Sequence, residues 1–167
     1  MLQSMNYLTM LVTNVLVIAV WHGTTLLMST HLPNSYFQPT SAQFQPWKWE
    51  KGGRWYRDHL HINDWKDRVP QFISQGGFSK RHLTNLSPEY LGTFIVETCR
   101  GEWTHTWNLG CVFVVLLMNQ SIVGITFSIL IFMGNGPCAV IQRYNRFRLV
   151  ALRDRLQRET ARIPAAT

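Results

Sequence analysis

Charge is missing from two long stretches of this chain of 167 residues. No lysine, arginine, aspartate or glutamate occurs in residues 1–47, and none occurs in the forty residues 103–142. A membrane-spanning helix needs about 20 residues without an unpaired charge, because the hydrocarbon layer offers an ion no water. This segregation of charge argues against an ordinary soluble domain and predicts an all-α integral membrane protein.

Cysteine is scarce and is not spaced for metal or redox chemistry. Cys99, Cys111 and Cys138 lie in or beside apolar segments and form no CxxC pair. Neither a disulfide framework nor a zinc site is predicted, and we interpret the three thiols as packing groups. A nucleophilic Cys99 is a minor alternative, which depends on the neighbouring Arg100 to lower the pKa of the thiol.

The excess of basic residues gives the chain a formal net charge of +7. A nucleic-acid-binding domain of this size would need a soluble core, whereas the apolar residues here lie in long uninterrupted runs. We therefore expect anionic membrane lipids or a phosphorylated ligand as partners, and no nucleic acid.

Three membrane-spanning helices account for the uncharged stretches. Residues 7–28 form one predicted span, and residues 91–118 and 121–142 form a helical hairpin that turns at Asn119 and Gln120. We treat residues 1–167 as a single multi-pass unit of the cell membrane, whose N-terminal span stays in place as an anchor.

Local signals mark where these helices begin and bend. Pro88 follows Ser87 and precedes Glu89, which is typical of a helix start. Pro137 falls inside the third span and is expected to kink it. The tail, residues 143–167, carries seven arginines with leucines at helical spacing, which predicts a basic amphipathic helix on an anionic leaflet.

The basic residues also predict the orientation of the spans. The loop 29–88 holds eight lysines and arginines and the tail holds seven, while the N-terminus and the hairpin turn hold none. Both basic segments are therefore predicted to be cytoplasmic, with the N-terminus outside. Tryptophan and tyrosine are interleaved with the basic residues of the loop, which is typical of the membrane interface.

One stripe of the second span carries ionisable groups to the membrane surface. At helical spacing Glu97, Arg100 and His105 fall on one side, with Glu102 at the edge of the stripe. The alternative is that Glu97 and Arg100 form an ordinary helix-surface ion pair and that His105 marks the interface. We favour a functional site, because a charge near the bilayer centre costs about 2.5 to 3.5 kcal/mol on insertion scales. A histidine beside a carboxylate is a common general base.

Further polar clusters lie on the predicted cytoplasmic side. HLHINDWKDRVP (59–70) contains Lys66 and Asp67, and SKRHL (79–83) and QRYNRFR (142–148) are strongly basic. Arginine forks bind phosphates bidentately, although positive-inside topology and lipid headgroup binding are the alternative explanation. The candidate metal ligands are His59, His61, His82 and His105. They lack the HxxxH and HxxHH spacings of membrane di-iron enzymes, so no metal site is predicted.

Four motifs follow one another along the chain. In order, they are WKDRVP, QGGFSKRHL, ETCRGE followed by HTW, and NGP followed by QRYNRFRL. Together they resemble the glycosyl-diaponeurosporenoate acyltransferases, membrane enzymes that finish staphyloxanthin-type pigments. The resemblance covers roughly residues 33–159, and QRYNR is its most specific segment.

This resemblance implies transfer of a fatty acyl group from acyl-CoA to a sugar hydroxyl of a lipid-embedded glycosylated carotenoid acid. Acyl-CoA is then a co-substrate, and no cofactor is expected. His105 is the expected base, with His82 as the alternative, while Glu97 or Glu102 orients it and Arg100 stabilises the oxyanion. The residues expected to bind the substrates are Lys66, Asp67, Arg81, Asn135, Gln142, Arg143, Tyr144, Asn145 and Arg146.

Two other functions stay open on the sequence. One is a non-catalytic membrane subunit or scaffold that docks a pigment-pathway enzyme through the aromatic loop. The other is a metal-dependent lipid hydroxylase. A homo-oligomer or a complex with a pathway enzyme is compatible with these functions.

Overall fold

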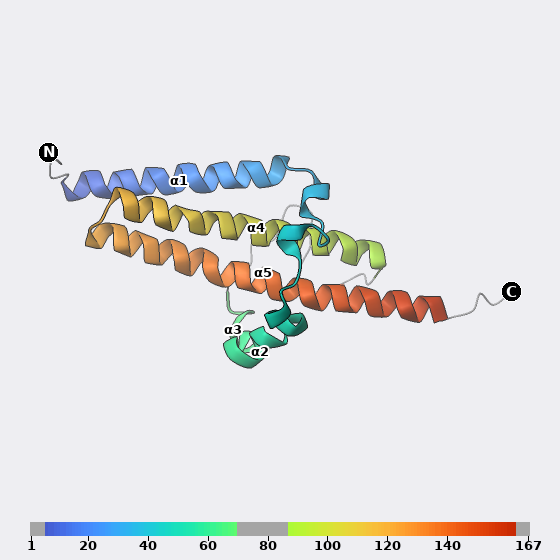
Figure 1. The fold of residues 1–167 in the computed structure, drawn as a ribbon. Coiled ribbons are helices and arrows are strands. Elements are labelled where there is room, and N and C mark those ends of the chain that lie inside the picture. The colour runs from blue at the N-terminus through green and yellow to red at the C-terminus, as the bar shows by residue number, and fades with distance from the viewer. Residues whose placement is uncertain (1–5, 70–86, 163–167) are drawn as a thin grey trace. The chain divides into compact units, whose positions relative to one another are not determined.

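The structure is a computed structural model that describes residues 6–69 and 87–162. Within these ranges every regular element is a helix, and there is no strand (Figure 1). The long helices are α1 (Tyr7–His31), α4 (Pro88–Met118) and α5 (Ile122–Arg162). Shorter elements lie between α1 and α4: η1 (Asn34–Phe37), η2 (Ala42–Phe44), η3 (Lys48–Gly53), α2 (Arg54–Leu60) and α3 (Ile62–Trp65). The predicted all-helical class is confirmed for the described residues.

Two of the described helices, α1 and α5, are long and apolar enough to cross a membrane. In the most apolar 18-residue stretch of each helix, only 11% of α1 and 22% of α5 is buried. A core helix of a soluble protein would be mostly buried. The buried residues of α1 are Asn14, Thr25 and Ser29, while Leu16 and Val20 are exposed. Polar groups inside and apolar groups outside indicate association with a membrane.

Helix α4 is long enough to span a bilayer, but it contains no stretch as apolar as those of α1 and α5. Its middle carries the polar stripe that begins at Glu97 and continues through His105 and Asn108, and these residues lower its hydropathy. The predicted span 91–118 therefore stays a prediction, while α1 and α5 agree with the predicted spans 7–28 and 121–142.

The predicted helix start and hairpin turn are both confirmed. Helix α4 begins at Pro88, and the Ser87 hydroxyl accepts a hydrogen bond of 3.2 Å from the backbone N–H of Tyr90. Such a cap satisfies one of the N–H groups that the first helical turn leaves unpaired. The chain leaves the helical conformation between Met118 and Ile122. Helix α5 continues through Pro137 without interruption.

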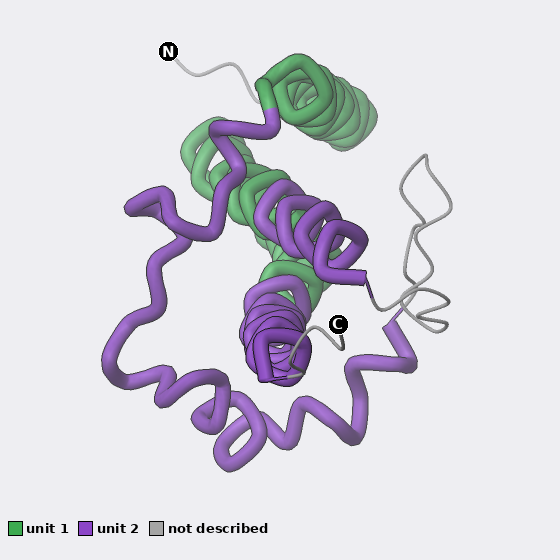
Figure 2. The backbone as a smooth tube through the Cα atoms, turned by 90° about the vertical axis from the view of Figure 1, so that its right-hand side faces the viewer, with its two compact units in different colours: residues 1–33, 101–140 green, residues 34–100, 141–167 purple. Residues whose placement is uncertain are grey.

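Contacts divide the chain into two compact units, which we call unit 1 (Met1–Pro33 and Gly101–Val140) and unit 2 (Asn34–Arg100 and Ile141–Thr167) (Figure 2). Helices α4 and α5 each contribute residues to both units. The prediction that residues 1–167 form one functional unit stays a prediction.

Unit 1 packs α1 against the second half of α4 and the first half of α5. Its buried core consists of Cys111, Val115 and Ile131, which also pack against residues of α1 such as Val17 and Ile18. The Trp21 indole N–H of α1 donates a hydrogen bond of 3.0 Å to the Trp107 carbonyl oxygen of α4. Gly110 permits this close approach, because a Cβ there would lie 3.1 Å from the Trp21 ring.

Unit 2 packs the first half of α4 against the second half of α5. Leu91, Phe94 and Ile95 form a buried cluster with Leu149, and Leu152 packs against its edge. The leucines of the tail were predicted to face an anionic leaflet. In the structure they face α4 instead, because α5 is one helix that carries their apolar stripe onto the apolar side of α4.

Candidate active site

A cluster of imidazole and carboxamide groups is the polar centre of unit 1. We call it the histidine–amide cluster: His22 of α1, His105 and Asn108 of α4, and Asn135 of α5. Asn135 Oδ1 lies 3.1 Å from His105 Nδ1 and accepts a hydrogen bond of 3.2 Å from Asn108 Nδ2. Asn135 Nδ2 lies 3.3 Å from His22 Nε2.

The protons in this cluster can be assigned from its carbonyl oxygens. A backbone carbonyl only accepts, so the Asn135 atom that lies 3.0 Å from the Ile131 carbonyl oxygen is the amide nitrogen. The other amide atom is then the oxygen, and His105 Nδ1 must donate to it. His105 is therefore the Nδ1–H tautomer when neutral, and its lone pair lies on Nε2. A base with a fixed tautomer has its accepting nitrogen defined before substrate binds.

His22 is a member of the cluster that the sequence analysis missed. Its Nδ1 lies 3.0 Å from the Ile18 carbonyl oxygen, so Nδ1 carries the proton and Nε2 accepts from Asn135. A local signal does exist, since Asn14, His22, Thr25 and Ser29 recur at helical spacing in a span that is mostly apolar. Polar residues on one face of a membrane helix indicate the face that turns to the protein interior.

Asn108 contributes an acceptor to the same cluster. Its side chain is 6% exposed, and no described residue donates a hydrogen bond to its Oδ1 atom. A buried acceptor without a donor costs about 1–3 kcal/mol, so such an atom suits a donor that arrives with a ligand or a water.

An apolar groove lies between α1 and α4 in unit 1. Its volume is about 460 Å³. Its lining residues are Leu16, Val17, Val20, Trp21, Thr24, Thr25, Met28, Trp107, Val114 and Met118. The lining carries no charged group, so the groove suits a hydrocarbon chain and not a phosphate.

Glu97 and Arg100 belong to unit 2, where they form an ion pair of 3.4 Å along α4. Arg100 also donates to Asn34 Oδ1, and its guanidinium lies 4.3 Å from the ring centre of Phe37. The ion pair that the sequence offered as the alternative is therefore present. Arg100 also ties the start of the loop to α4. The role predicted for Glu97 in orienting the base and the role predicted for Arg100 in stabilising the oxyanion stay predictions.

A buried ion pair of unit 2 is centred on Glu50, whose side chain is fully buried. Arg143 binds its carboxylate with two hydrogen bonds of 2.7 and 2.8 Å, and the Tyr56 hydroxyl donates at 2.6 Å. The backbone N–H of Trp47 also donates to this carboxylate. Burial alone would raise the pKa of Glu50, but the hydrogen bonds from Arg143, Tyr56 and Trp47 hold it below its ordinary value.

The QRYNR segment fastens the loop to α5 through further contacts. Tyr144 donates to Asn63 Oδ1 at 3.1 Å, and Arg146 donates to the Phe44 carbonyl oxygen at 3.2 Å. Arg143 and Arg146 are only 6% and 3% exposed. Their phosphate-binding role stays a prediction, while the structure gives both a role in holding the loop.

The other predicted residues have varied environments. Lys66 pairs with Asp67 at 2.7 Å, and Gln142, Asn145 and Glu102 are half-buried. Arg81 and His82 lie outside the described residues. Asn135 is bonded within the histidine–amide cluster, and its substrate-binding role stays a prediction.

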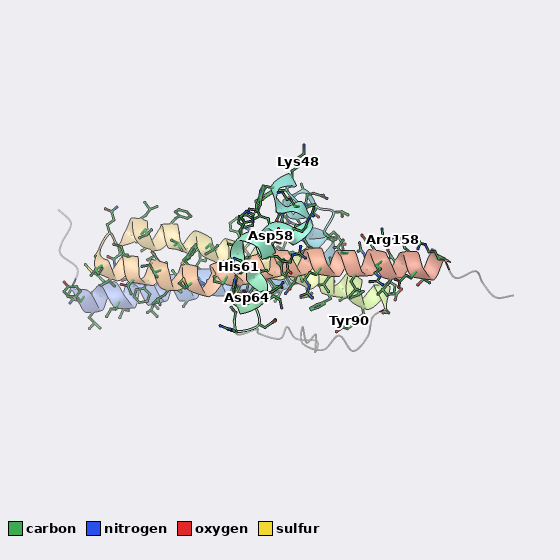
Figure 3. The ribbon with its side chains drawn as sticks, turned by 90° about the horizontal axis from the view of Figure 1, so that it is seen from below. Lys48, Asp58, His61, Asp64, Tyr90 and Arg158 are labelled. Carbon is green, nitrogen blue, oxygen red and sulfur yellow. The ribbon has the colours of Figure 1, made fainter. Side chains whose placement is uncertain are left out.

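The remaining candidate metal ligands do not form a cluster in the described part of the chain. His61 is exposed, as are Lys48, Asp58 and Asp64 in the same segment (Figure 3). His59 is also exposed and stacks on Trp55, with ring centres 5.1 Å apart. Among residues 6–69 and 87–162, no group of three histidine, cysteine or acidic side chains is placed to hold a metal ion.

Two long apolar helices and a half-buried cluster of imidazole and carboxamide groups indicate a helical, membrane-associated protein with a candidate proton-transfer site. The family model of glycosyl-4,4'-diaponeurosporenoate acyltransferase matches residues 33–155. The chain therefore belongs to this acyltransferase family, which confirms the resemblance drawn from its motifs.

Individual relatives carry the same name. Glycosyl-4,4'-diaponeurosporenoate acyltransferases from Staphylococcus aureus strains Newman and N315 are each 26% identical to this chain, over 142 and 137 residues. Each match covers 81% of this chain and 82% of the relative. No solved structure matches the chain. The enzyme class is thus acyltransferase.

Proposed function

We propose that this protein transfers a fatty acyl group from acyl-CoA to a sugar hydroxyl of a glycosylated carotenoid acid held in the membrane, as the last step of staphyloxanthin-type pigment synthesis. The observation that carries the proposal is the fixed tautomer of His105, which presents Nε2 as a base within a lipid-exposed helical unit. The family name supports the reaction class and the type of acceptor.

In the proposed reaction His105 Nε2 removes the proton of the sugar hydroxyl as its oxygen attacks the thioester carbonyl carbon. The tetrahedral intermediate then collapses, the carbon–sulfur bond breaks, and the imidazolium returns the proton to the CoA thiolate. Backbone N–H groups stabilise the oxyanion, and Glu102, which belongs to unit 1 like His105, stabilises the imidazolium. Each carotenoid ester formed thus releases one free CoA.

We propose distinct places for the two kinds of substrate group. The sugar hydroxyl donates a hydrogen bond to Asn108 Oδ1. This oxygen is a buried acceptor of unit 1 to which no described residue donates. A hydrocarbon chain lies in the apolar groove of α1 and α4. The phosphates of acyl-CoA bind the basic side of the loop through Lys66 and Arg81, with Arg143 and Arg146 contributing from α5.

The proposed topology has three spans, namely α1, α4 and the apolar part of α5. The N-terminus lies outside, and the loop 29–88 and the tail are cytoplasmic, because the basic residues are concentrated there. Burial of Asn108 and partial burial of His105 support α4 as a span, since polar groups at membrane depth face the protein interior.

The competing proposal is a non-catalytic subunit that docks a pathway enzyme. Its support is the exposed aromatic surface of the loop, where Trp47 is 59% and Trp49 43% exposed. Purified protein in phospholipid vesicles, given radiolabelled acyl-CoA and the glycosylated carotenoid acid, separates the two functions. An acyltransferase forms the labelled carotenoid ester and one free CoA per ester. A scaffold forms neither, and that result would contradict our proposal.

A further inference from the structure

The Asn135 side chain is bonded at every position that a carboxamide offers. Its nitrogen faces the Ile131 carbonyl oxygen at 3.0 Å and His22 Nε2 at 3.3 Å. Its oxygen faces His105 Nδ1 at 3.1 Å and Asn108 Nδ2 at 3.2 Å. Two N–H donors and two lone pairs are the full capacity of this group. Asn135 is also buried, with 7% of its surface exposed.

This arrangement holds the amide in one orientation. A flip of the Asn135 carboxamide would place its oxygen against the Ile131 carbonyl oxygen and its nitrogen against the Asn108 amide nitrogen. Each lost hydrogen bond between buried groups costs about 1–3 kcal/mol, and a flip loses several. The orientation of Asn135 therefore determines which nitrogen of His105 carries the proton.

His22 contributes to this orientation from a different helix. Its Nδ1–H group donates to Ile18, so Nε2 is left to accept from Asn135. An imidazolium at His22 would place an N–H group against the Asn135 N–H group. Neutral His22 thus fits the amide orientation that gives His105 its Nδ1–H tautomer.

We infer that Asn135 and His22 are positioning residues that fix the tautomer of His105, and so couple two histidines through one carboxamide. The inference rests on the proposed function only for its kinetic consequence, because the tautomer is a property of the protein without substrate. A purely structural network would also join α1, α4 and α5. Removing such a network would lower stability without changing the tautomer of the folded protein.

Nitrogen-15 NMR of the full-length protein in lipid bilayers, labelled at the histidine imidazoles, measures the tautomer directly. Comparison with a His105→Gln spectrum identifies the His105 signals. We expect the Nδ1–H tautomer in the wild type and in Asn135→Asp, whose carboxylate still accepts from Nδ1. In Asn135→Leu we expect a mixture with the Nε2–H tautomer. An Nε2–H tautomer in the wild type, or an unchanged tautomer in Asn135→Leu, would overturn the inference.

Turnover measured on the same variants separates the two proposals. We expect Asn135→Leu to lower kcat about 10- to 100-fold with the KM for acyl-CoA changed less than about twofold, as for loss of a positioned base. His22→Phe should lower kcat less, and His22→Gln should restore it, because the Gln oxygen can accept from Asn135. Asn14→Leu is the matched control, a buried asparagine of unit 1 outside the cluster. If the NMR spectra show the predicted tautomers but the wild type transfers no acyl group, only the proposed function is contradicted. Acyl transfer with kcat unchanged in Asn135→Leu would contradict only the positioning role.

Discussion

Arg143 of α5 donates two hydrogen bonds to the carboxylate of Glu50, from Nε to Oε1 at 2.7 Å and from Nη2 to Oε2 at 2.8 Å. The two residues are 93 positions apart in the chain. Since both side chains are buried, neither charge can be left without the other. This pair therefore holds the loop against α5 within unit 2.

The first prediction concerns Glu50→Gln. The change leaves the Arg143 guanidinium buried without its counter-charge, and breaking a buried ion pair costs about 3–5 kcal/mol. We expect a large drop in the unfolding midpoint, measured in detergent by circular dichroism. Glu159→Gln is the matched control, because its pair with Arg155 is exposed. Equal midpoints for the two variants would show that the Glu50 pair does not stabilise the loop.

The second prediction is the pH dependence of stability. Hydrogen bonds to the carboxylate hold the folded-state pKa of Glu50 below its ordinary value of 4.5. The unfolded chain therefore binds the proton more readily, and the stabilisation is complete above about pH 4.5 and is lost as the pH falls toward the folded-state pKa. Denaturant titrations between neutral and acid pH should show this loss. The acid slope should be smaller in Glu50→Gln, and an identical slope would argue against the assignment.

The third prediction concerns Gly53, which has a φ of +88° and lies against Phe147. A Cβ added there would lie 3.1 Å from Phe147 Cβ and 3.4 Å from its ring. Gly53→Ala combines backbone strain with this crowding, so we expect a loss of about 1–3 kcal/mol in unfolding free energy. Gly52→Ala is the control, because Gly52 also has a positive φ but has open space at its Cβ. It should cost less than Gly53→Ala, and the reverse order would contradict the role of Phe147.

The fourth prediction is the topology. A reporter fused after Gln120 should be accessible from outside the cell, and one fused after Arg162 should be accessible only from the cytoplasm. Cytoplasmic labelling at both positions would place the hairpin turn inside the cell, and it would contradict α4 as a membrane span.

Much of the fold follows from local features of the sequence. The segregation of charge predicted the apolar helices, and Ser87-Pro88 predicted the start of α4, because capping and burial of apolar runs depend on neighbouring residues. The turn at Asn119 and Gln120 was predicted for the same reason. The continuation of α5 into the tail was not predicted. The apolar and the basic segment differ in composition, so the sequence suggested two separate helices where the structure has one.

The candidate site was less predictable, because its contacts join residues that are far apart. His105 was singled out by its stripe on α4, but His22 and Asn135 are separated by 113 positions. The buried partners of Arg143 and Arg146 were missed as well. A cluster of arginines has the same pattern in sequence whether it faces phosphates or a buried carboxylate such as Glu50.

The most direct test of the account is the turnover of His105→Gln, measured as CoA released with acyl-CoA and the glycosylated carotenoid acid in vesicles. His31→Gln serves as the control, because His31 is an exposed histidine at the end of α1. We predict that His105→Gln lowers kcat by about 100- to 10,000-fold, the contribution of a general base, while His31→Gln keeps the wild-type rate. A folded His105→Gln protein that forms the ester at the wild-type rate would contradict the assignment of His105 as the base.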